Sequence, residues 1–119
     1  MKEFITIALS EDSIDEFLAK EIESFRYYLV QEVQTQSHLL ANQLNDLHRH
    51  EGGAYVSDQM IHVLKDSITV EENGEGHLVL SYYTQREVNG TDASEWEDVE
   101  VAFTIVPESK ELRLCFPQK

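Results

Sequence analysis

His48 and His50 stand beside Glu51 near the end of a helical pattern, and imidazole and carboxylate groups are common zinc ligands. A helical zinc site places two histidines four residues apart on one face, whereas the rings of a His-x-His pair diverge. The glutamates of residues 71–75 lack the Asp-x-Asp-x-Asp-Gly order of a calcium loop. We therefore expect surface histidines and no metal site.

Other catalytic patterns are also weak. Cys115 alternates between Leu114 and Phe116, which is typical of an inert residue in a strand. Gly74 and Gly76 lie among glutamates, which repel a phosphate. We expect no cofactor and no enzymatic activity, and the function has to be inferred from charge and shape.

Carboxylates are the chemical groups that this chain has in excess. Its 119 residues include 23 Asp and Glu against nine Lys and Arg, a formal net charge of −14. Nucleic acid and anionic membrane surfaces repel such a chain, because each needs cations opposite its own negative charge. A basic protein is the partner class that the charge favours, because a large field of one sign accelerates encounter with the opposite sign. Uniform solubilisation by charge is the simpler alternative.

The negative charge is unevenly distributed along the chain. Residues 1–32 carry eight acidic and three basic residues, and residues 66–100 carry ten and one, whereas the other two segments are nearly neutral. On a helix, a four-residue step advances about 6 Å, close to the spacing of neighbouring phosphates on a nucleic-acid strand. Trp96, among Glu95, Glu97 and Asp98, has the character of an interface anchor. The candidate partner-binding residues are Asp12, Asp15, Glu16 and Glu23 on the helical side, and Glu71, Glu72, Glu75, Asp92, Glu95, Glu97, Asp98 and Glu100 on the sheet side.

Helices are predicted in the first half of the chain, after a short apolar strand or arm at residues 4–9. Ser10 or Ser13 is a candidate N-cap, followed by acidic residues that suit the positive end of a helix dipole. Apolar residues then recur at three- and four-residue steps, which places them on one stripe. They are Ile14, Phe17, Leu18, Ile22, Phe25, Leu29 and Val33, and the period resumes at Leu40, Leu44 and Leu47. One long helix and two helices broken near Thr35 both fit.

Strands are predicted in the second half, where the apolar period becomes two. Residues 55–65 are ambiguous, and a short helix is favoured over a strand. The glycines of residues 71–76 predict a hairpin turn, and Asn89-Gly90 predicts another turn. Alternating strands follow at residues 78–83, 99–105 and 112–116. The expected fold is α+β, one domain over residues 1–119, with N-terminal amphipathic helices packed on one face of a C-terminal antiparallel β-meander.

The expected location is the cytoplasm. Cys115 is the only cysteine, so no internal disulfide indicates an oxidising compartment. No stretch approaches the roughly 20 apolar residues of a membrane span. We also expect a monomer.

Small size, clustered acidity and the lack of catalytic signals make the chain resemble bacterial DNA-mimic proteins, in particular the small acidic ones of Neisseria. The resemblance is one of general character, because that group shares no sequence motif. It implies a protein that displays carboxylates like a phosphate backbone and occupies the DNA-binding surface of a basic protein, such as histone-like HU or a transcription factor.

Two other classes remain open. One is another acidic interaction protein, either a secretion chaperone, which usually dimerises, or an immunity protein. The other is a small cone-shaped α+β enzyme, which requires a deep apolar pocket containing His77, Tyr83 or Glu100.

Overall fold

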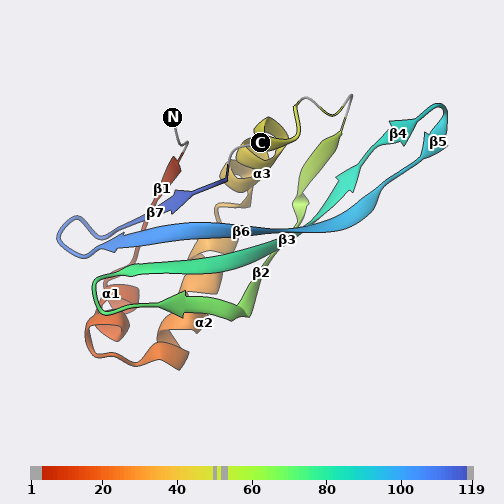
Figure 1. Ribbon diagram of the computed structural model, residues 1–119. Helices are drawn as coiled ribbons and strands as arrows, with labels where there is room; N and C mark the ends of the chain where they lie inside the picture. The colour runs from red at the N-terminus through yellow and green to blue at the C-terminus, as the bar shows by residue number, and fades with distance from the viewer. Residues whose placement is uncertain (1–3, 50, 52–53, 118–119) are drawn as a thin grey trace.

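The protein has an antiparallel sheet with three helices on one of its faces (Figure 1). The computed structural model describes residues 4–49, 51 and 54–117. In chain order the elements are β1 (Phe4–Ala8), α1 (Glu11–Leu18), α2 (Ile22–Gln34), α3 (Ser37–Leu47), β2 (Tyr55–Val70), β3 (Glu75–Gln85), β4 (Glu87–Val88), β5 (Thr91–Asp92), β6 (Glu95–Val106) and β7 (Glu111–Cys115). The predicted α+β fold is confirmed. Among the described residues, no helix is long and apolar enough to cross a membrane.

The main sheet has the strand order β1-β7-β6-β3-β2. Strands β2, β3, β6 and β7 form the expected meander, and the opening strand β1 extends it by pairing antiparallel with β7. Beyond Gln85 the chain continues into the small β4–β5 hairpin, which we call the arm; it projects at the upper right of Figure 1. Asn89 and Gly90 both have positive φ in its tight turn, which confirms the turn predicted there.

The helical region is divided twice. Ser10 caps α1 by accepting a hydrogen bond from the Ser13 amide. The helix ends in a Schellman motif, in which Lys20 (φ 62°) and Glu21 donate backbone hydrogen bonds back into the last turn. The single stripe predicted through this region is therefore interrupted, and Leu18 is 60% exposed instead of buried. The second break, at Thr35 and Gln36, agrees with one of the two alternatives, the one with a break near Thr35.

Residues 55–65 form part of the long strand β2, so the short helix favoured there is wrong. The strand pairs with β3 but shifts register twice, between Val56 and Ile61 and between Leu64 and Thr69. These irregularities break the two-residue alternation, so the buried residues Val56, Ile61, Val63 and Ile68 are five, two and five positions apart.

Side chains from the helices bind the backbone of β2, which is an edge strand. The Gln34 amide donates to the Ile61 carbonyl at 2.5 Å and accepts from the Val63 amide at 3.1 Å. Asn45 exchanges a similar pair of hydrogen bonds with Val56, at 2.8 and 2.9 Å. Because an unpaired edge is a template for pairing with other chains, these contacts both fix α2 and α3 on the sheet and protect its edge.

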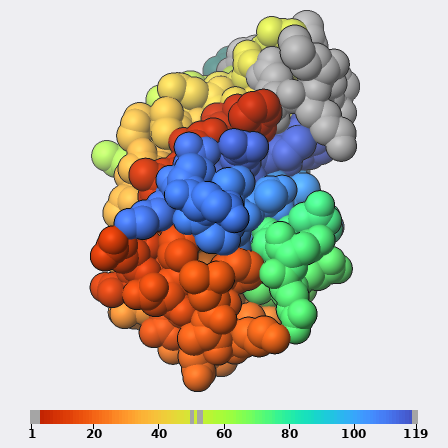
Figure 2. All heavy atoms as spheres, turned by 90° about the vertical axis from the view of Figure 1, so that its left-hand side faces the viewer, coloured from red at the N-terminus to blue at the C-terminus, as the bar shows by residue number. Residues whose placement is uncertain are grey.

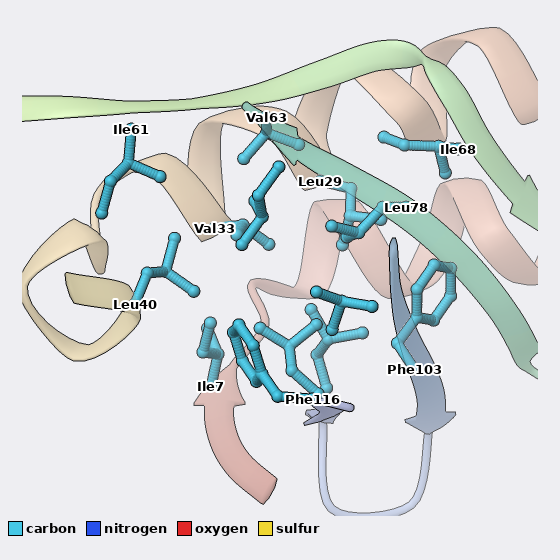
Figure 3. Packing of buried hydrophobic residues seen from close by; sticks show 14 of the residues in the cluster. Ile7, Leu29, Val33, Leu40, Ile61, Val63, Ile68, Leu78, Phe103 and Phe116 are labelled. Carbon is cyan, nitrogen blue, oxygen red and sulfur yellow. The ribbon is translucent and has the colours of Figure 1, made fainter. Parts of the chain in front are cut away.

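The core lies between the helices and the inner face of the sheet. Figure 3 shows Leu29, Val33 and Leu40 of the helices facing Val63 of β2 and Leu78 of β3. Each fully buried leucine stabilises the fold by about 1.5–3 kcal/mol. The alternation of buried and exposed residues along β3 and β6 leaves the other face of the sheet to solvent.

Gly76 tests the tight packing of the hairpin between β2 and β3. A Cβ atom there would meet the backbone carbonyl of Thr69 and lie 2.5 Å from Cζ of Phe103. We expect Gly76→Ala to lower the free energy of unfolding by about 2 kcal/mol, measured by urea denaturation. Gly90→Ala is the control: its φ of 78° strains an alanine by about 1 kcal/mol, but nothing lies within 4 Å. Equal losses for the two variants would contradict the close approach at Gly76.

Candidate acidic interaction surface

Three segments that are distant in sequence meet at one end of the molecule. They are residues 11–21, the β2–β3 turn at residues 71–75 and the β6–β7 turn at residues 107–110, and we call this region the acidic end. It contains nine acidic and two basic residues, a formal net charge of −7. Figure 2 looks directly at it, with α1 in orange, the β2–β3 turn in green and the β6–β7 turn in blue. Half of the net charge of the chain is therefore concentrated here.

Two lysines join the segments of the acidic end. Lys20 Nζ lies 2.9 Å from Glu72 Oε1, which links the end of α1 to the β2–β3 turn. Lys110 Nζ lies 2.6 Å from Glu11 Oε1, which links the β6–β7 turn to the start of α1. In each pair the lysine hydrogen bond lowers the pKa of the glutamate, so Glu11 and Glu72 remain ionised at neutral pH.

The start of α1 is held against α2 by a carboxylate. Glu32 accepts hydrogen bonds from the Ser10 amide, at 2.6 Å, and from the Ser13 hydroxyl. Ser13 is fully buried. The first turn of α1 therefore has a fixed position, and Asp12 and Asp15 project from a rigid helix.

Six of the predicted partner-binding residues lie at the acidic end. Asp12 and Asp15 on α1, and Glu71, Glu72 and Glu75 at the turn, are exposed, and Glu16 is half-buried. Glu23 follows on α2, where Arg26 at 2.7 Å and Lys65 at 3.7 Å compensate its charge. The structure therefore brings the predicted acidic residues of α1 close to those of the β2–β3 turn.

Asp92 and Glu95 lie in a different place, in and beside the arm. Strand β3 begins at the acidic end and reaches the arm after 11 residues, a separation of about 33 Å at the rise of a strand. This exceeds the Debye length of about 8 Å at physiological ionic strength, so the two groups act as separate surfaces. Two hydrogen bonds from Ser94, through its hydroxyl and its amide, lower the pKa of Asp92.

The remaining three predicted residues belong to β6 and point in two directions. Asp98 and Glu100 are exposed on the outer face of the sheet. The Glu97 carboxylate instead accepts a hydrogen bond from Thr84 at 2.6 Å and pairs with Arg86 at 2.9 Å. Glu97 is therefore engaged within the protein and is not displayed to a partner.

His48 is buried, and the expectation of a surface histidine is wrong for this residue. Its Nδ1 lies 2.6 Å from a Glu51 carboxylate oxygen, and its Nε2 lies 2.7 Å from the Tyr82 hydroxyl. Because a carboxylate only accepts, Nδ1 donates to Glu51, and Nε2 shares the second hydrogen bond with the Tyr82 hydroxyl. The sequence did contain a signal, since His48 continues the four-residue step of Leu40 and Leu44.

Arg86 completes this polar cluster, which consists of His48, Glu51, Tyr82, Arg86 and Glu97. Its guanidinium pairs with Glu51 and with Glu97, both at 2.9 Å, and so ties the end of the helical region to the sheet. It is the single basic residue of the segment 66–100. Within the described part of the chain its Nε atom is buried without a hydrogen-bond partner. Sequence reasoning missed this cluster, because only the tertiary fold brings the end of the helical region beside Tyr82, Arg86 and Glu97.

The described residues include those considered for a metal site, for an enzyme pocket and for a reactive cysteine. No group of three or more His, Cys, Asp or Glu side chains in this part of the chain is arranged to hold a metal ion. His77, Tyr83 and Glu100, which the enzyme alternative placed in a deep pocket, lie on the outer face of the sheet. An open groove at the base of the arm is lined by polar and aromatic side chains, among them Tyr55 and Arg86. Cys115 is a half-buried residue of β7, as predicted.

Comparisons with protein-family models, with curated proteins and with solved structures found no match to this chain.

Tyr82→Phe tests the polar cluster. The substitution leaves buried Nε2 of His48 without its hydrogen-bond partner, so we expect the free energy of unfolding to fall by about 1–3 kcal/mol in urea denaturation. Tyr27→Phe, at a residue that is 57% exposed, is the control and should change stability by less than about 0.5 kcal/mol. A Tyr82→Phe protein as stable as the control would show that the hydroxyl contributes nothing.

The pH dependence of stability provides a second test of Tyr82. Burial, with the nearby Glu97 and Glu51 carboxylates, raises the pKa of its phenol above the ordinary value of 10.0. Above pH 10 the unfolded chain loses this proton while the folded protein keeps it, so the stabilisation is complete below pH 10 and decreases above it. We expect the wild type to lose up to about 1.4 kcal/mol per pH unit more than Tyr82→Phe in this range. Parallel stability curves above pH 10 would contradict the shift.

Proposed function

We propose that this protein is a DNA mimic, which binds the DNA-binding surface of a basic protein through the acidic end and thereby competes with DNA. The observation that carries the proposal is the convergence of residues 11–21 with residues 71–75 in one exposed, negatively charged region. A coat of charge that served only solubility would not require two acidic segments to meet.

The spacing of the carboxylates supports recognition of a surface that binds phosphates. On α1, Glu11 and Asp15 are four residues apart, which corresponds to a rise of about 6 Å along the helix axis. The β2–β3 turn places further carboxylates beside this row, and Lys20 fixes the turn through Glu72. A basic groove would therefore meet two adjoining acidic rows, as it does on a duplex.

The binding mechanism that follows is ionic replacement. Carboxylates of the acidic end pair with lysine and arginine side chains that otherwise bind phosphates, and counterions are released as they are from DNA. Each exposed ion pair contributes little by itself, about 0.2–1 kcal/mol. Affinity therefore depends on many simultaneous contacts and decreases steeply with salt.

The partner class is a basic DNA-binding protein such as histone-like HU or a transcription factor. This follows from the resemblance to DNA-mimic proteins together with the net charge of −14. The same charge opposes direct contact with nucleic acid and with anionic membranes.

Neutralising three carboxylates of the acidic end tests the proposal. We expect the triple variant Asp12→Asn, Asp15→Asn, Glu71→Gln to need at least about tenfold more protein to displace a labelled duplex from histone-like HU. The measurement is fluorescence anisotropy at about 50 mM salt, with the wild type losing potency as salt rises. The matched control, Glu87→Gln, Asp92→Asn, Glu95→Gln, makes the same charge change at the arm and should lose less than about threefold.

Two outcomes would count against the proposal. If HU and other basic DNA-binding proteins keep their DNA in the presence of excess wild-type protein at low salt, the protein is not a DNA mimic. If both triple variants lose potency equally, net charge and not the acidic end determines competition.

The oligomeric state separates this proposal from the secretion-chaperone alternative. We expect light scattering to give the monomer mass of 13.7 kDa, because a single acidic end is sufficient to occupy a basic groove. A dimer mass would favour the chaperone.

A further inference from the structure

Three rings form a cluster on the outer face of the sheet, outside both the acidic end and the polar cluster. The rings of His62 and Trp96 are stacked, with centroids 5.7 Å apart and an interplanar angle of 27°. Tyr83 is tilted by 56° against Trp96 at 5.4 Å. We call these three residues the outer aromatic cluster. Trp96 is nevertheless 50% exposed, so much of its indole is accessible.

Strand register explains why these rings meet. Tyr83 of β3 lies directly opposite Trp96 of β6, and Ser81 of β3 lies opposite both His62 and Asp98. Because neighbouring strands are about 4.8 Å apart, rings on β2 and β6 touch only by leaning over the strand between them. The small side chain of Ser81 leaves room for this contact.

Carboxylates continue the same face along β6. Asp98 and Glu100 follow Trp96 at two-residue steps, so all three side chains point outward, and both carboxylates are exposed. Strands β3 and β6 contain no lysine or arginine. His77 on β3 lies beside Glu100, with its Nε2 3.9 Å from the carboxylate. An accessible indole therefore stands beside two carboxylates that no lysine or arginine of these strands neutralises.

Charge decides which occupant this face accepts. A second copy of the chain would bring Asp98 and Glu100 against like charges, and nucleic acid or anionic lipid would be repelled in the same way. A cationic side chain is favoured by both the carboxylates and the indole, since tryptophan is the best aromatic partner of a cation. Arginine fits better than lysine, because its planar guanidinium stacks on a ring and binds a carboxylate through two donors at once.

We propose that the outer aromatic cluster binds an arginine side chain of the partner protein, with the guanidinium stacked on Trp96 and paired with Asp98. The inference rests on the proposed function for the class of partner, but it concerns a second contact. Along β3, Tyr83 is eight residues from Glu75, about 26 Å from the acidic end. This second contact would add a preference for arginine to an interaction that is otherwise governed by charge alone.

Trp96 is the only tryptophan of the chain, so its fluorescence reports directly on this face. The probes are octa-arginine, octalysine and octaglutamate peptides at about 50 mM salt. We expect saturable changes in indole emission with the two cationic peptides, about fivefold tighter for arginine than for lysine, and no change with octaglutamate.

Matched variants locate the contact. Asp98→Asn should weaken the octa-arginine affinity seen by emission about fivefold, whereas Asp92→Asn, the same change at the arm, should weaken it less than twofold. Trp96→Ala, followed by calorimetry, should also lose about fivefold, with Tyr27→Ala as its control at another exposed aromatic residue. Circular dichroism checks that each variant is folded.

Three results would overturn the inference: an indole emission that does not respond to octa-arginine, equal affinities for octa-arginine and octalysine, or equal effects of Asp98→Asn and Asp92→Asn. An emission change on concentrating the protein alone, accompanied by a dimer mass, would assign the face to self-association instead and would also overturn it. The emission and DNA-displacement assays, run on the same wild-type protein, distinguish this inference from the proposed function. If wild-type protein displaces DNA from HU but the indole does not respond, this inference alone fails; if the indole responds but DNA is not displaced, the DNA-mimic proposal fails.

Discussion

A five-stranded sheet has two faces, and three short helices cover only one of them. The inward apolar side chains of β3 and β6 are therefore committed to the core, from Leu78 and Leu80 to Phe103 and Ile105. Every outward side chain is free of that constraint, because water replaces the missing layer. The distribution of charge follows from this division: the carboxylates gather where the core does not need apolar side chains, at the ends of strands, in turns and on the uncovered face.

The protein uses its few cations in two different ways. At the acidic end Lys20 and Lys110 are exposed, so their ion pairs add little stability, but they fix three separate segments beside one another. In the polar cluster Arg86 neutralises two carboxylates near the buried His48 and Tyr82, where an uncompensated charge would be costly. Negative charge is thus balanced where it is close to the core and left unbalanced where it meets solvent. That contrast makes the acidic end distinct from a general excess of acid.

Much of the fold could be predicted from the sequence because alternation records which face of a strand is buried. The two-residue period at residues 78–82 and 99–105 correctly identified the inner face of β3 and β6. The same rule failed in β2, because two register shifts leave its buried residues, Val56, Ile61, Val63 and Ile68, five, two and five positions apart. The end of α1 near Lys20 could not be predicted, because no glycine or proline stands there in the sequence.

The exposure of single acidic residues could be predicted from the sequence, but their grouping into the acidic end could not. Acidic side chains outside an apolar stripe are expected to be exposed, and Asp12, Asp15 and Glu71 are exposed. Which of them are neighbours depends on tertiary contacts, such as the one between Lys20 and Glu72, that no local pattern encodes. Glu97 continues the two-residue step of Val99 and Val101 and so faces inward, but its contacts with Thr84 of β3 and with Arg86 depend on tertiary structure.

The pairing of β1 with β7 has a consequence for how the chain folds during synthesis. It joins Phe4 to Cys115 and Ala8 to Glu111, so one edge of the sheet closes only after residues 111–115 have been made. Contacts this distant in sequence carry a large loop-closure entropy, and they slow folding more than they affect final stability. The hairpins from β2 to β7 are local by comparison and can form first. Until β7 is present, the apolar side chains of β1, including Ile7, which is buried in the folded protein, remain exposed. Repulsion between acidic chains opposes self-association through this unpaired strand.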